Sequence, residues 1–385
     1  MLGSGARISQ LMSESASAGP AAQVRPAVIA DYPQIASLEV RYGLHAKPYD
    51  EWQHLWVGNP ACKDPATWTI GWVVENDRQE VVGYVGNVPS LLEFRGQTLL
   101  AVSGRGLVVD DRYRSYAFPL FSKFINQPGV DLIINTTVNA QALKLHELFR
   151  CNRVPVGAWN RSVFWITHYR EFAAKLAATK HLPLPSLVSY PLAAVLAVKD
   201  FTHRKLDGKV PNGFELSVSS SFDERFDLFW EELRARRQHT LLTNRRSDAL
   251  NWHFYYATSH GRAWVETITS NGKLHAYAIF VRQDNHVTGL NRLRLVDFQA
   301  LDGTSEMLIP MLSVACERCR DQGIHMLEVI GFAPAKKQVL APFAPHHRDL
   351  PCWLYFYKAK DKTLAEILKD PSVWDPSPFD GDGAI

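Results

Sequence analysis

The chain has 385 residues, a formal net charge of +3, 21% charged residues and 46% hydrophobic residues. At roughly 100–200 residues per domain, this length predicts about two domains, each able to bury a core without disulfides. The nearly balanced charge argues against a general nucleic-acid binder, and no apolar run reaches the roughly 20 residues of a membrane span. We therefore expect a cytoplasmic globular protein, with neither a nucleic-acid nor a membrane partner.

The cysteines give no disulfide framework, because they are odd in number and scattered, and a reducing compartment fits them. Two of them form a Cys-x-x-Cys spacing, but the surrounding segment has the apolar pattern of an amphipathic helix and no second pair completes a zinc site. We expect core thiols and no metal. The five positions are Cys62, Cys151, Cys316, Cys319 and Cys352.

Residues 1–23 are rich in Ser, Ala and Gly and lack the apolar centre of a secretory signal. They are predicted to form a flexible N-terminal tail. An organelle transit peptide is the alternative, although Glu14 is acidic and Arg7 is the one basic residue up to position 23.

Residues 24–170 alternate helical and strand patterns. The apolar spacing predicts helices over 31–41, 117–126 and 140–149. Strands are expected over 68–75, 81–89, 91–94, 98–109, 131–136 and 162–167. Turn-forming residues separate the strands, and Arg95-Gly96 predicts a tight hairpin. The order indicates an α+β, or mixed α/β, unit with one crossover.

Residues 171–214 are predicted to be a linker with one short helix, because prolines interrupt their apolar run. Residues 215–385 then repeat the order of the first half. Helices are expected over 222–237 and 307–320, and strands over 263–269, 274–282, 292–299 and 326–330. Ser270-Asn271-Gly272-Lys273 predicts the hairpin between the first two strands. The repeated order favours a tandem duplication.

The segment LLAVSGRGLVVDDRYRSYAFPLFSKFI contains a strand that ends at Val109 and a helix that begins near Ala117. A strand-to-helix turn presents backbone N–H groups and the positive end of a helix dipole, which suits a pyrophosphate. Arg112 and Arg114 add cationic donors. The alternative is two solvated charges in a loop.

A second segment, VDLIINTTVNAQALKLHELFRC, places Asn139 between a strand and a helix. The two segments together resemble the GCN5-related N-acetyltransferase family, abbreviated GNAT. Its Arg-x-x-Gly-x-Gly/Ala pattern corresponds to Arg114-Ser115-Tyr116-Ala117-Phe118-Pro119, and its Asn-x-x-Ala-x-x-x-Tyr pattern to Asn139-x-x-Ala142-x-x-x-His146. Both glycines and the tyrosine are replaced, so neither motif is intact.

The resemblance implies two tandem GNAT-like domains, each a mixed, mostly antiparallel sheet flanked by helices. It also implies acetyl-CoA or another acyl-CoA as co-substrate, without a metal, and places residues 106–109 beside the pantetheine arm. The cofactor-binding positions it implies are Leu107, Val108, Val109, Arg112, Tyr113, Arg114, Ser115, Tyr116, Ala117, Phe118, Asn139 and Ala142.

Two residues are candidates for proton transfer. His146 stands where the family's tyrosine acts as general acid and could protonate the leaving thiolate. The alternative is a solvent-facing helix histidine. The pattern does not identify the base, and Glu93 is the candidate by its position. Asp110 and Asp111 are expected to cap the next turn or to pair with the arginines, since negative charges oppose phosphate binding.

The second half is expected to shape the acceptor site. Asn251-Trp252-His253-Phe254 resembles a segment of tandem acyltransferases of surface-sugar and amino-sugar pathways. Strand alternation puts Arg292 and Arg294 on one face, where they could grip a diphosphate or carboxylate, and Asp297 on the other. A solvated strand face is the alternative. The acceptor candidates are Arg245, Arg246, Asn251, His253, Arg292, Arg294 and Asp297.

The function favoured by these observations is transfer of an acyl group from acyl-CoA to a primary amine of a small molecule, preferably a nucleotide-linked amino sugar. Residues 24–170 would bind acyl-CoA and residues 215–385 the acceptor, in a monomer or homodimer. Two alternatives stay open. One is Fem-type aminoacyl transfer from charged tRNA, and the other is a tandem GNAT protein that binds a metabolite without catalysis.

Overall fold

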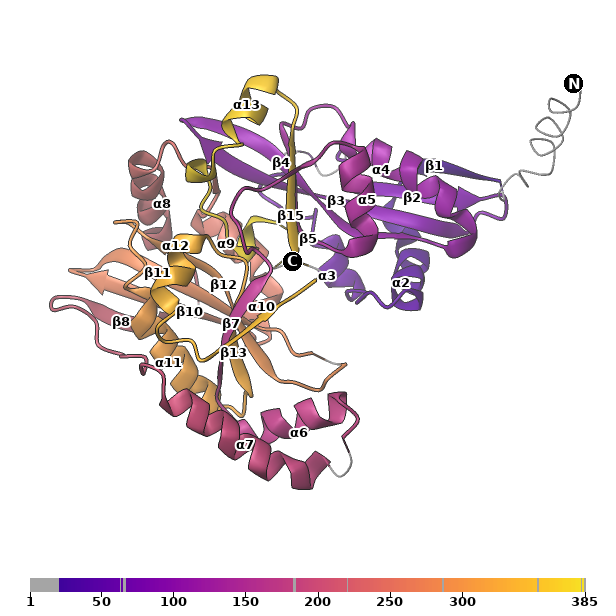
Figure 1. Cartoon of the computed structure of the whole chain (residues 1–385). Coiled ribbons are helices and arrows are strands. Elements are labelled where there is room, and N and C mark those ends of the chain that lie inside the picture. Colours follow the sequence, from indigo (N-terminus) through magenta and orange to yellow (C-terminus); the bar gives the residue numbers. More distant parts are fainter. Residues whose placement is uncertain are drawn as a thin grey trace, which may run out of the picture. The chain divides into compact units, whose positions relative to one another are not determined.

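The computed structural model describes residues 21–62, 64, 67–182, 185–219, 221–285, 287–351, 353–381 and 383. The chain forms two mixed β-sheets flanked by helices (Figure 1), as predicted from the sequence. It divides into two compact units. Unit 1 comprises residues 1–57, 64–88 and 104–128, and unit 2 comprises residues 58–63, 89–103 and 129–385. Most of the tail predicted over 1–23 lies outside the described residues.

Unit 1 contains an antiparallel arrangement of β1 (Ala22–Pro26), β2 (Gly71–Asn76) and the first part of β3 (Val81–Phe94), and the second half of β4 (Gln97–Val109). Its helices are η1 (Ile29–Asp31), α2 (Tyr32–Arg41), α3 (Tyr49–Gln53), η2 (Asp111–Tyr116) and α4 (Ala117–Ile125). The apolar faces of α2 and α4, which the sequence spacing predicted, pack in the core. Phe124 of α4, for example, meets Trp72 of β2 edge to face.

β3 and β4 continue into unit 2, where Arg95 and Gly96 form the predicted hairpin turn with φ of 52° and 75°. β3 is one strand of 14 residues, whereas two strands were predicted, one ending at Pro89 and the other beginning at Leu91. Proline removes a ladder donor and usually interrupts a strand. Here the extended backbone passes through it.

The unit 2 part of this sheet carries β5 (Leu132–Val138), β15 (Leu354–Ala359) and β6 (Asn152–Arg153) in that order, and β9 (Leu242–Thr243) pairs with β3. β4 and β5 are parallel, and their ladder comprises only the pairs Ala101↔Leu132 and Val102↔Ile133. α5 (Ala140–Leu148) follows β5, and α13 (Lys362–Ile367) follows β15.

The second sheet lies entirely in unit 2 and has the order β14-β7-β13-β12-β11-β10-β8 (Figure 1). The strands are β14 (His346–Asp349), β7 (Arg161–Ile166), β13 (Met326–Val329), β12 (Arg292–Ala300), β11 (Lys273–Arg282), β10 (Ala263–Ser270) and β8 (Glu215–Ser219). Asn271 and Gly272 adopt positive φ in the β10–β11 turn, as predicted.

Helices cover both faces of this sheet, and they account for its two apolar clusters. α11 (Leu308–Asp321) packs Leu308, Leu312 and Ala315 against one face, and α8 (Glu224–Arg236) packs Phe226 and Phe229 against the other. The other helices are α6 (Tyr169–Thr179), α7 (Pro185–Phe201), α9 (Ser247–His253), α10 (Tyr255–Ser259), α12 (Pro334–Leu340), η3 (Pro371–Val373) and η4 (Pro378–Asp380).

Two strands cross between the predicted halves. The strand predicted over 162–167 was expected to close the first half, but as β7 it pairs with β13 and β14 in the second sheet. In return, β15 from the end of the chain pairs with β5. A strand's apolar pattern determines which of its faces are buried but not its neighbours, so the sequence could not reveal this exchange. The division of labour between residues 24–170 and 215–385 stays a prediction.

The segment predicted as a linker over 171–214 contains α7 and nearly all of α6. α7 continues for 17 residues with Pro191 inside it, so the short helix expected there is wrong. The predicted helix around Cys316 and Cys319 is confirmed as α11, and burial raises the pKa of the Cys316 thiol to about 12. Both thiols lie in the core.

No helix in the described ranges combines the length and the apolar character needed to cross a membrane. In that same part of the chain, no group of three or more His, Cys, Asp and Glu side chains is arranged to hold a metal ion.

Candidate functional site

The turn after β4 is the centre of the predicted cofactor site, and its first backbone donors are already bonded. Asp110 caps η2, since its Oδ1 accepts from the Arg112 N–H at 3.1 Å and its carbonyl accepts from the Tyr113 N–H at 2.8 Å. The Asp111 N–H donates to the Tyr42 hydroxyl at 2.9 Å. The expectation of free N–H groups in this turn is therefore wrong, because the 3-10 helix and its aspartate cap engage them.

The two arginines of the turn differ in their surroundings. Arg114 pairs with Asp111 at 2.7 Å, and both side chains are largely exposed. The exposed Arg112 side chain makes no ion pair or hydrogen bond with the part of the chain that the structure describes. Asp110 also pairs with Arg41 at 3.2 Å. Arg112 is therefore the cation of this turn that remains available to a ligand.

The other predicted cofactor positions of unit 1 split into packed and accessible groups. The Tyr116 hydroxyl accepts from the Ala22 N–H at 2.9 Å, and the Tyr113 hydroxyl lies 3.3 Å from Asn76 Nδ2, so both tyrosines hold the turn to β1 and β2. Val108 is buried, whereas Leu107, Val109 and Ala117 are half-buried and Ser115 and Phe118 are exposed.

A buried polar cluster that the sequence prediction missed lies against β4. Arg105 pairs with Glu39 of α2 at 3.0 Å, and the Glu39 side chain is only 2% exposed. Burial raises the pKa of Glu39 above its ordinary value, although Arg105 opposes the shift. The adjacent Gly106 has φ of +69°, and a Cβ there would lie 2.4 Å from Glu39 Oε1. The Gly-Arg-Gly sequence inside a predicted strand was the available signal for such a bend.

His146 is not the accessible group that either reading of the sequence expected. It is 3% exposed, its Nδ1 lies 2.8 Å from the Ala142 carbonyl, and its Nε2 lies 2.9 Å from Asn135 Nδ2. A carbonyl can only accept, so Nδ1 carries the proton and Nε2 accepts from the Asn135 amide. Both ring nitrogens are thus engaged, Nδ1 within α5 and Nε2 between α5 and β5. The centres of the His146 and Phe356 rings lie 5.2 Å apart.

The remaining members of the predicted motif around His146 have helix-end roles. Asn139 caps α5, because its Oδ1 accepts from the Gln141 and Ala142 N–H groups at 3.1 and 2.9 Å. The Ala142 carbonyl receives the His146 hydrogen bond. These contacts explain the motif by local structure within unit 2.

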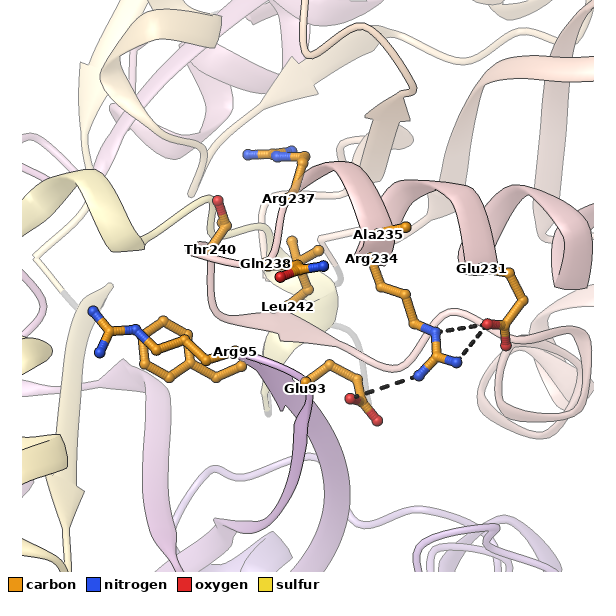
Figure 2. Close-up of a pocket in the computed structure, with 11 residues that line it drawn as sticks. Glu93, Arg95, Glu231, Arg234, Ala235, Arg237, Gln238, Thr240 and Leu242 are labelled. Atoms are coloured by element: carbon orange, nitrogen blue, oxygen red, sulfur yellow. Dashed lines mark hydrogen bonds and ion pairs between the residues drawn. The ribbon is translucent and has the colours of Figure 1, made fainter.

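Glu93, the candidate base, lies on a small pocket of about 240 Å³ within unit 2 (Figure 2). It accepts from Thr98 Oγ1 at 2.6 Å and pairs with Arg234 at 3.9 Å. Figure 2 shows Arg234 between Glu93 and Glu231, and its Nε donates to Glu231 at 2.7 Å. The carboxylate is therefore held by a cation, and nothing in this geometry singles it out as a base.

The structure brings Arg292 and Arg294 together, as predicted, around a carboxylate that the sequence did not indicate. Arg294 Nε lies 2.7 Å and Arg292 Nη1 3.3 Å from the same oxygen of Glu328 in β13. Arg348 of β14 lies 2.6 Å from the other oxygen. Burial alone would raise the pKa of Glu328, but Arg294, Arg292 and Arg348 lower it to about 2.

The strand face predicted for Asp297 is wrong. The pairing of β11 with β12 shifts register at Val296, which is one extra residue in β12. Asp297 therefore lies on the same face of the strand as Arg294 and not on the opposite face. There it is fully buried and bonds to Arg245 at 2.9 Å and to the Tyr277 hydroxyl at 2.8 Å. Arg245 is also fully buried and reaches Asp380 of η4 at 3.2 Å. Arg245 and Asp297 therefore fasten the C-terminal segment and are not open to an acceptor.

The remaining candidates lie in α9 or directly before it, and His253 and Arg245 both contact the Phe379 ring. Asn251 donates to the Phe222 carbonyl at 2.7 Å, and the His253 ring packs on Phe379 at 4.7 Å. Arg246 pairs with Glu231 at 3.1 Å. These contacts give each side chain a structural partner within unit 2.

No protein-family model matches the chain, and no curated protein matches its sequence. Solved structures do match its fold. An N-acetyltransferase of the GCN5-related type from Anabaena variabilis ATCC 29413 aligns with 89% of this chain and 73% of its own, at 12% identity and a TM-score of 0.51. One from Kribbella flavida aligns with 90% of this chain and 72% of its own, at 10% identity and a TM-score of 0.53.

A Saccharomyces cerevisiae N-myristoyltransferase with bound myristoyl-CoA is similar to the chain to the same degree. It aligns with 88% of this chain and 80% of its own, at 10% identity and a TM-score of 0.53. The chain therefore has the fold of the GCN5-related N-acetyltransferases and N-myristoyltransferases, as the resemblance of its two motifs implied.

Proposed function

We propose that the protein is an acyl-CoA-dependent N-acyltransferase that acts on a primary amine of a small molecule. The observation that carries the proposal is the alignment of about nine-tenths of the chain with enzymes of this type, one of them holding myristoyl-CoA. Fold alone does not define a reaction, so the residues of the site must also suit the co-substrate.

At the end of β4, the groups suited to bind an acyl-CoA are side chains more than backbone N–H groups. Arg112 offers an available guanidinium at the amino-terminal end of the η2–α4 helical stretch, where the helix dipole also favours an anion. Gly106 bends β4 at the position that the resemblance places beside the pantetheine arm. Arg112 and Ser115 would hold the phosphates, and the residues from Gly106 to Val109 would line the arm.

An acyl-CoA would supply the activated acyl group as a thioester. The chain's own part is to position the amine and to hold the polar atoms of the thioester.

For the acceptor, we propose a nucleotide-linked amino sugar. The support is the resemblance of Asn251-Trp252-His253-Phe254 to a segment of tandem acyltransferases of surface-sugar and amino-sugar pathways.

The test uses the full chain, acetyl-CoA and a longer acyl-CoA, and a panel of amines that includes UDP-linked amino sugars. Thiol release is followed with a colorimetric reagent and the acylated product by mass. We expect release that depends on the amine, with a product heavier by one acyl group. Absence of both for every pair would contradict the proposal.

One observation favours a second candidate, a protein that binds a metabolite without turnover. The capped donors of the turn after β4 leave fewer N–H groups for a pyrophosphate than the family's glycine-rich loop provides. Binding of acyl-CoA without thiol release across the same panel would select this candidate.

A further inference from the structure

Three guanidinium groups surround one carboxylate where β12, β13, β14 and β7 meet in unit 2. Besides the three arginine contacts, Glu328 accepts from Ser162 Oγ at 2.7 Å. Its side chain is fully buried, whereas those of Arg292, Arg294 and Arg348 are 11%, 10% and 35% exposed. Solvent therefore reaches the three arginine side chains, and the Glu328 carboxylate lies buried beneath them.

The charges of this group do not balance. Arg282 at the end of β11 and Asp284 of the loop that follows pair with one another at 2.9 Å and cancel. Arg292, Arg294 and Arg348 against Glu328 then leave a formal excess of +2. Burial lowers the pKa of Arg292 to about 10, and the like charges of Arg294 and Arg348 add to this. Partly buried cations that repel one another are costly unless an anion joins them.

The guanidinium groups are held in fixed orientations. Arg292 Nε donates to the Gln283 carbonyl at 3.0 Å, and Arg294 Nη1 donates to Gln283 Oε1 at 2.9 Å. The Arg294 guanidinium also lies 5.1 Å from the centre of the Trp353 ring. Guanidinium groups fixed in this way are suited to bidentate recognition of a planar or tetrahedral oxyanion.

The position of this group relates it to the end of β5. The Trp353 ring that contacts Arg294 also lies against Gly383, where an added Cβ would be 3.5 Å from it. The Gly383 N–H donates to Thr136 Oγ1 of β5 at 3.0 Å. Within unit 2, the Trp353 ring and Gly383 therefore lie between the arginines and Thr136 of β5.

We propose that Arg292, Arg294 and Arg348 bind an anionic group, a phosphate or a carboxylate, of the acceptor molecule. The identification of the ligand as the acceptor rests on the proposed function, and binding of the anion itself does not. A cationic subsite beside β5 selects amines that carry a phosphate or carboxylate several bonds from the nitrogen, and it disfavours simple alkylamines.

The test measures binding of inorganic pyrophosphate and of malonate to the full chain by calorimetry at low ionic strength. Arg348→Gln removes the most exposed of the three cations, and we expect it to weaken binding about tenfold or more, as for a charge-assisted hydrogen bond. Arg161→Gln is the matched control, because Arg161 lies beside this pair of strands, pairs with Asp349 at 3.7 Å and is 51% exposed. It should leave binding unchanged.

A second variant separates a ligand site from a structural ion pair. Glu328→Gln keeps the size of the side chain but removes the competing carboxylate, so it should tighten anion binding about tenfold even where it lowers stability. Pyrophosphate could also bind at the turn after β4, so Arg112→Gln is measured in parallel. The preference between pyrophosphate and malonate indicates which oxyanion the acceptor carries.

The outcomes are distinct. Equal binding by Arg348→Gln and the parent chain, loss of binding in Arg112→Gln instead, or binding of neither anion would overturn the proposal. Anion binding that depends on Arg348, in a chain that binds no acyl-CoA, would refute the proposed function and leave the anion subsite standing. With an acylated acceptor in hand, Arg348→Gln should raise KM for that acceptor and leave KM for acyl-CoA unchanged.

Discussion

The buried carboxyl group of Glu266 in β10 predicts how the stability of the chain depends on pH. Its side chain is fully buried, and neither carboxyl oxygen has a hydrogen-bond partner in the part of the chain that the structure describes. Burial raises its pKa from 4.5 to about 8, although Arg318 opposes the shift. The folded chain therefore keeps this proton at pH values where the unfolded chain has released it.

The direction and size of the effect follow from linkage. Because the pKa of Glu266 is higher in the folded chain than in the unfolded chain, the free energy of unfolding falls as pH rises from about 4.5. This fall is complete above about pH 8. At about 1.36 kcal/mol for each pH unit, the difference amounts to about 5 kcal/mol over this window. That is a large fraction of the roughly 5–15 kcal/mol by which a domain is stable.

The perturbation is Glu266→Gln, measured by urea unfolding at pH 5, 6, 7 and 8. The buried amide of the variant has no hydrogen-bond partner at any pH, so its effect on stability does not change with pH. The measurement therefore compares the slopes of the unfolding free energy against pH and not the absolute values. We expect the variant to lose less stability than the parent between pH 5 and 8, by about 3 kcal/mol or more. Glu317→Gln on the exposed side of α11 is the control. Identical slopes for Glu266→Gln and the parent would contradict a raised pKa of Glu266 in the folded chain.

Gly106, His146 and Arg245 each make contacts whose loss should be measurable. Gly106→Ala should lower the unfolding free energy by about 2–4 kcal/mol, because it adds a clash with Glu39 to a left-handed backbone, whereas Gly96→Ala, with open space around it, should cost about 1 kcal/mol; equal losses in urea unfolding would contradict this. His146→Phe should lower stability by about 1–3 kcal/mol and leave the alkaline limb of the pH–rate profile in place; loss of that limb would restore His146 as a general acid. Arg245→Met leaves buried carboxylates unpaired and should cost about 3–5 kcal/mol; a loss below about 1 kcal/mol would contradict the role assigned to it.

Local signals in the sequence predicted most of the elements. Asn271-Gly272 and Arg95-Gly96 form the hairpin turns expected of them. Glycine adopts positive φ at low cost and asparagine does so more readily than most residues, whereas Arg95 adopts it beside its glycine at φ of 52°. The apolar spacing of α4, α8 and α11 determined both their extents and their buried faces.

What the sequence could not predict depends on partners distant in the chain. β7 and β15 have ordinary strand patterns, and nothing in them says that each joins the sheet of the other half. The bulge at Val296 moved Asp297 to the opposite face from the one that simple alternation predicts. A bulge is set by how two strands fit, which a single strand does not encode.

The site was predicted in part for the same reason. Arg292 and Arg294 lie on one face as strand alternation requires, but Glu328 and Arg348 reach them from β13 and β14. Asp110 was expected to cap a turn, and it does so. That cap uses the backbone donors that the motif alone suggested were free, because a motif shows residue types and not which acceptors already hold them.

Direct binding of acyl-CoA to the full chain is the most immediate test of the proposed activity. Calorimetric titration with acetyl-CoA and with myristoyl-CoA should give one saturable site, with a dissociation constant within the micromolar to millimolar range of roughly 1 μM to 1 mM that enzymes show for their substrates. Binding to Arg112→Gln should be weaker, and higher salt should narrow the difference. Absence of binding by any acyl-CoA up to millimolar concentration would contradict the assignment of this chain as an acyl-CoA-dependent transferase.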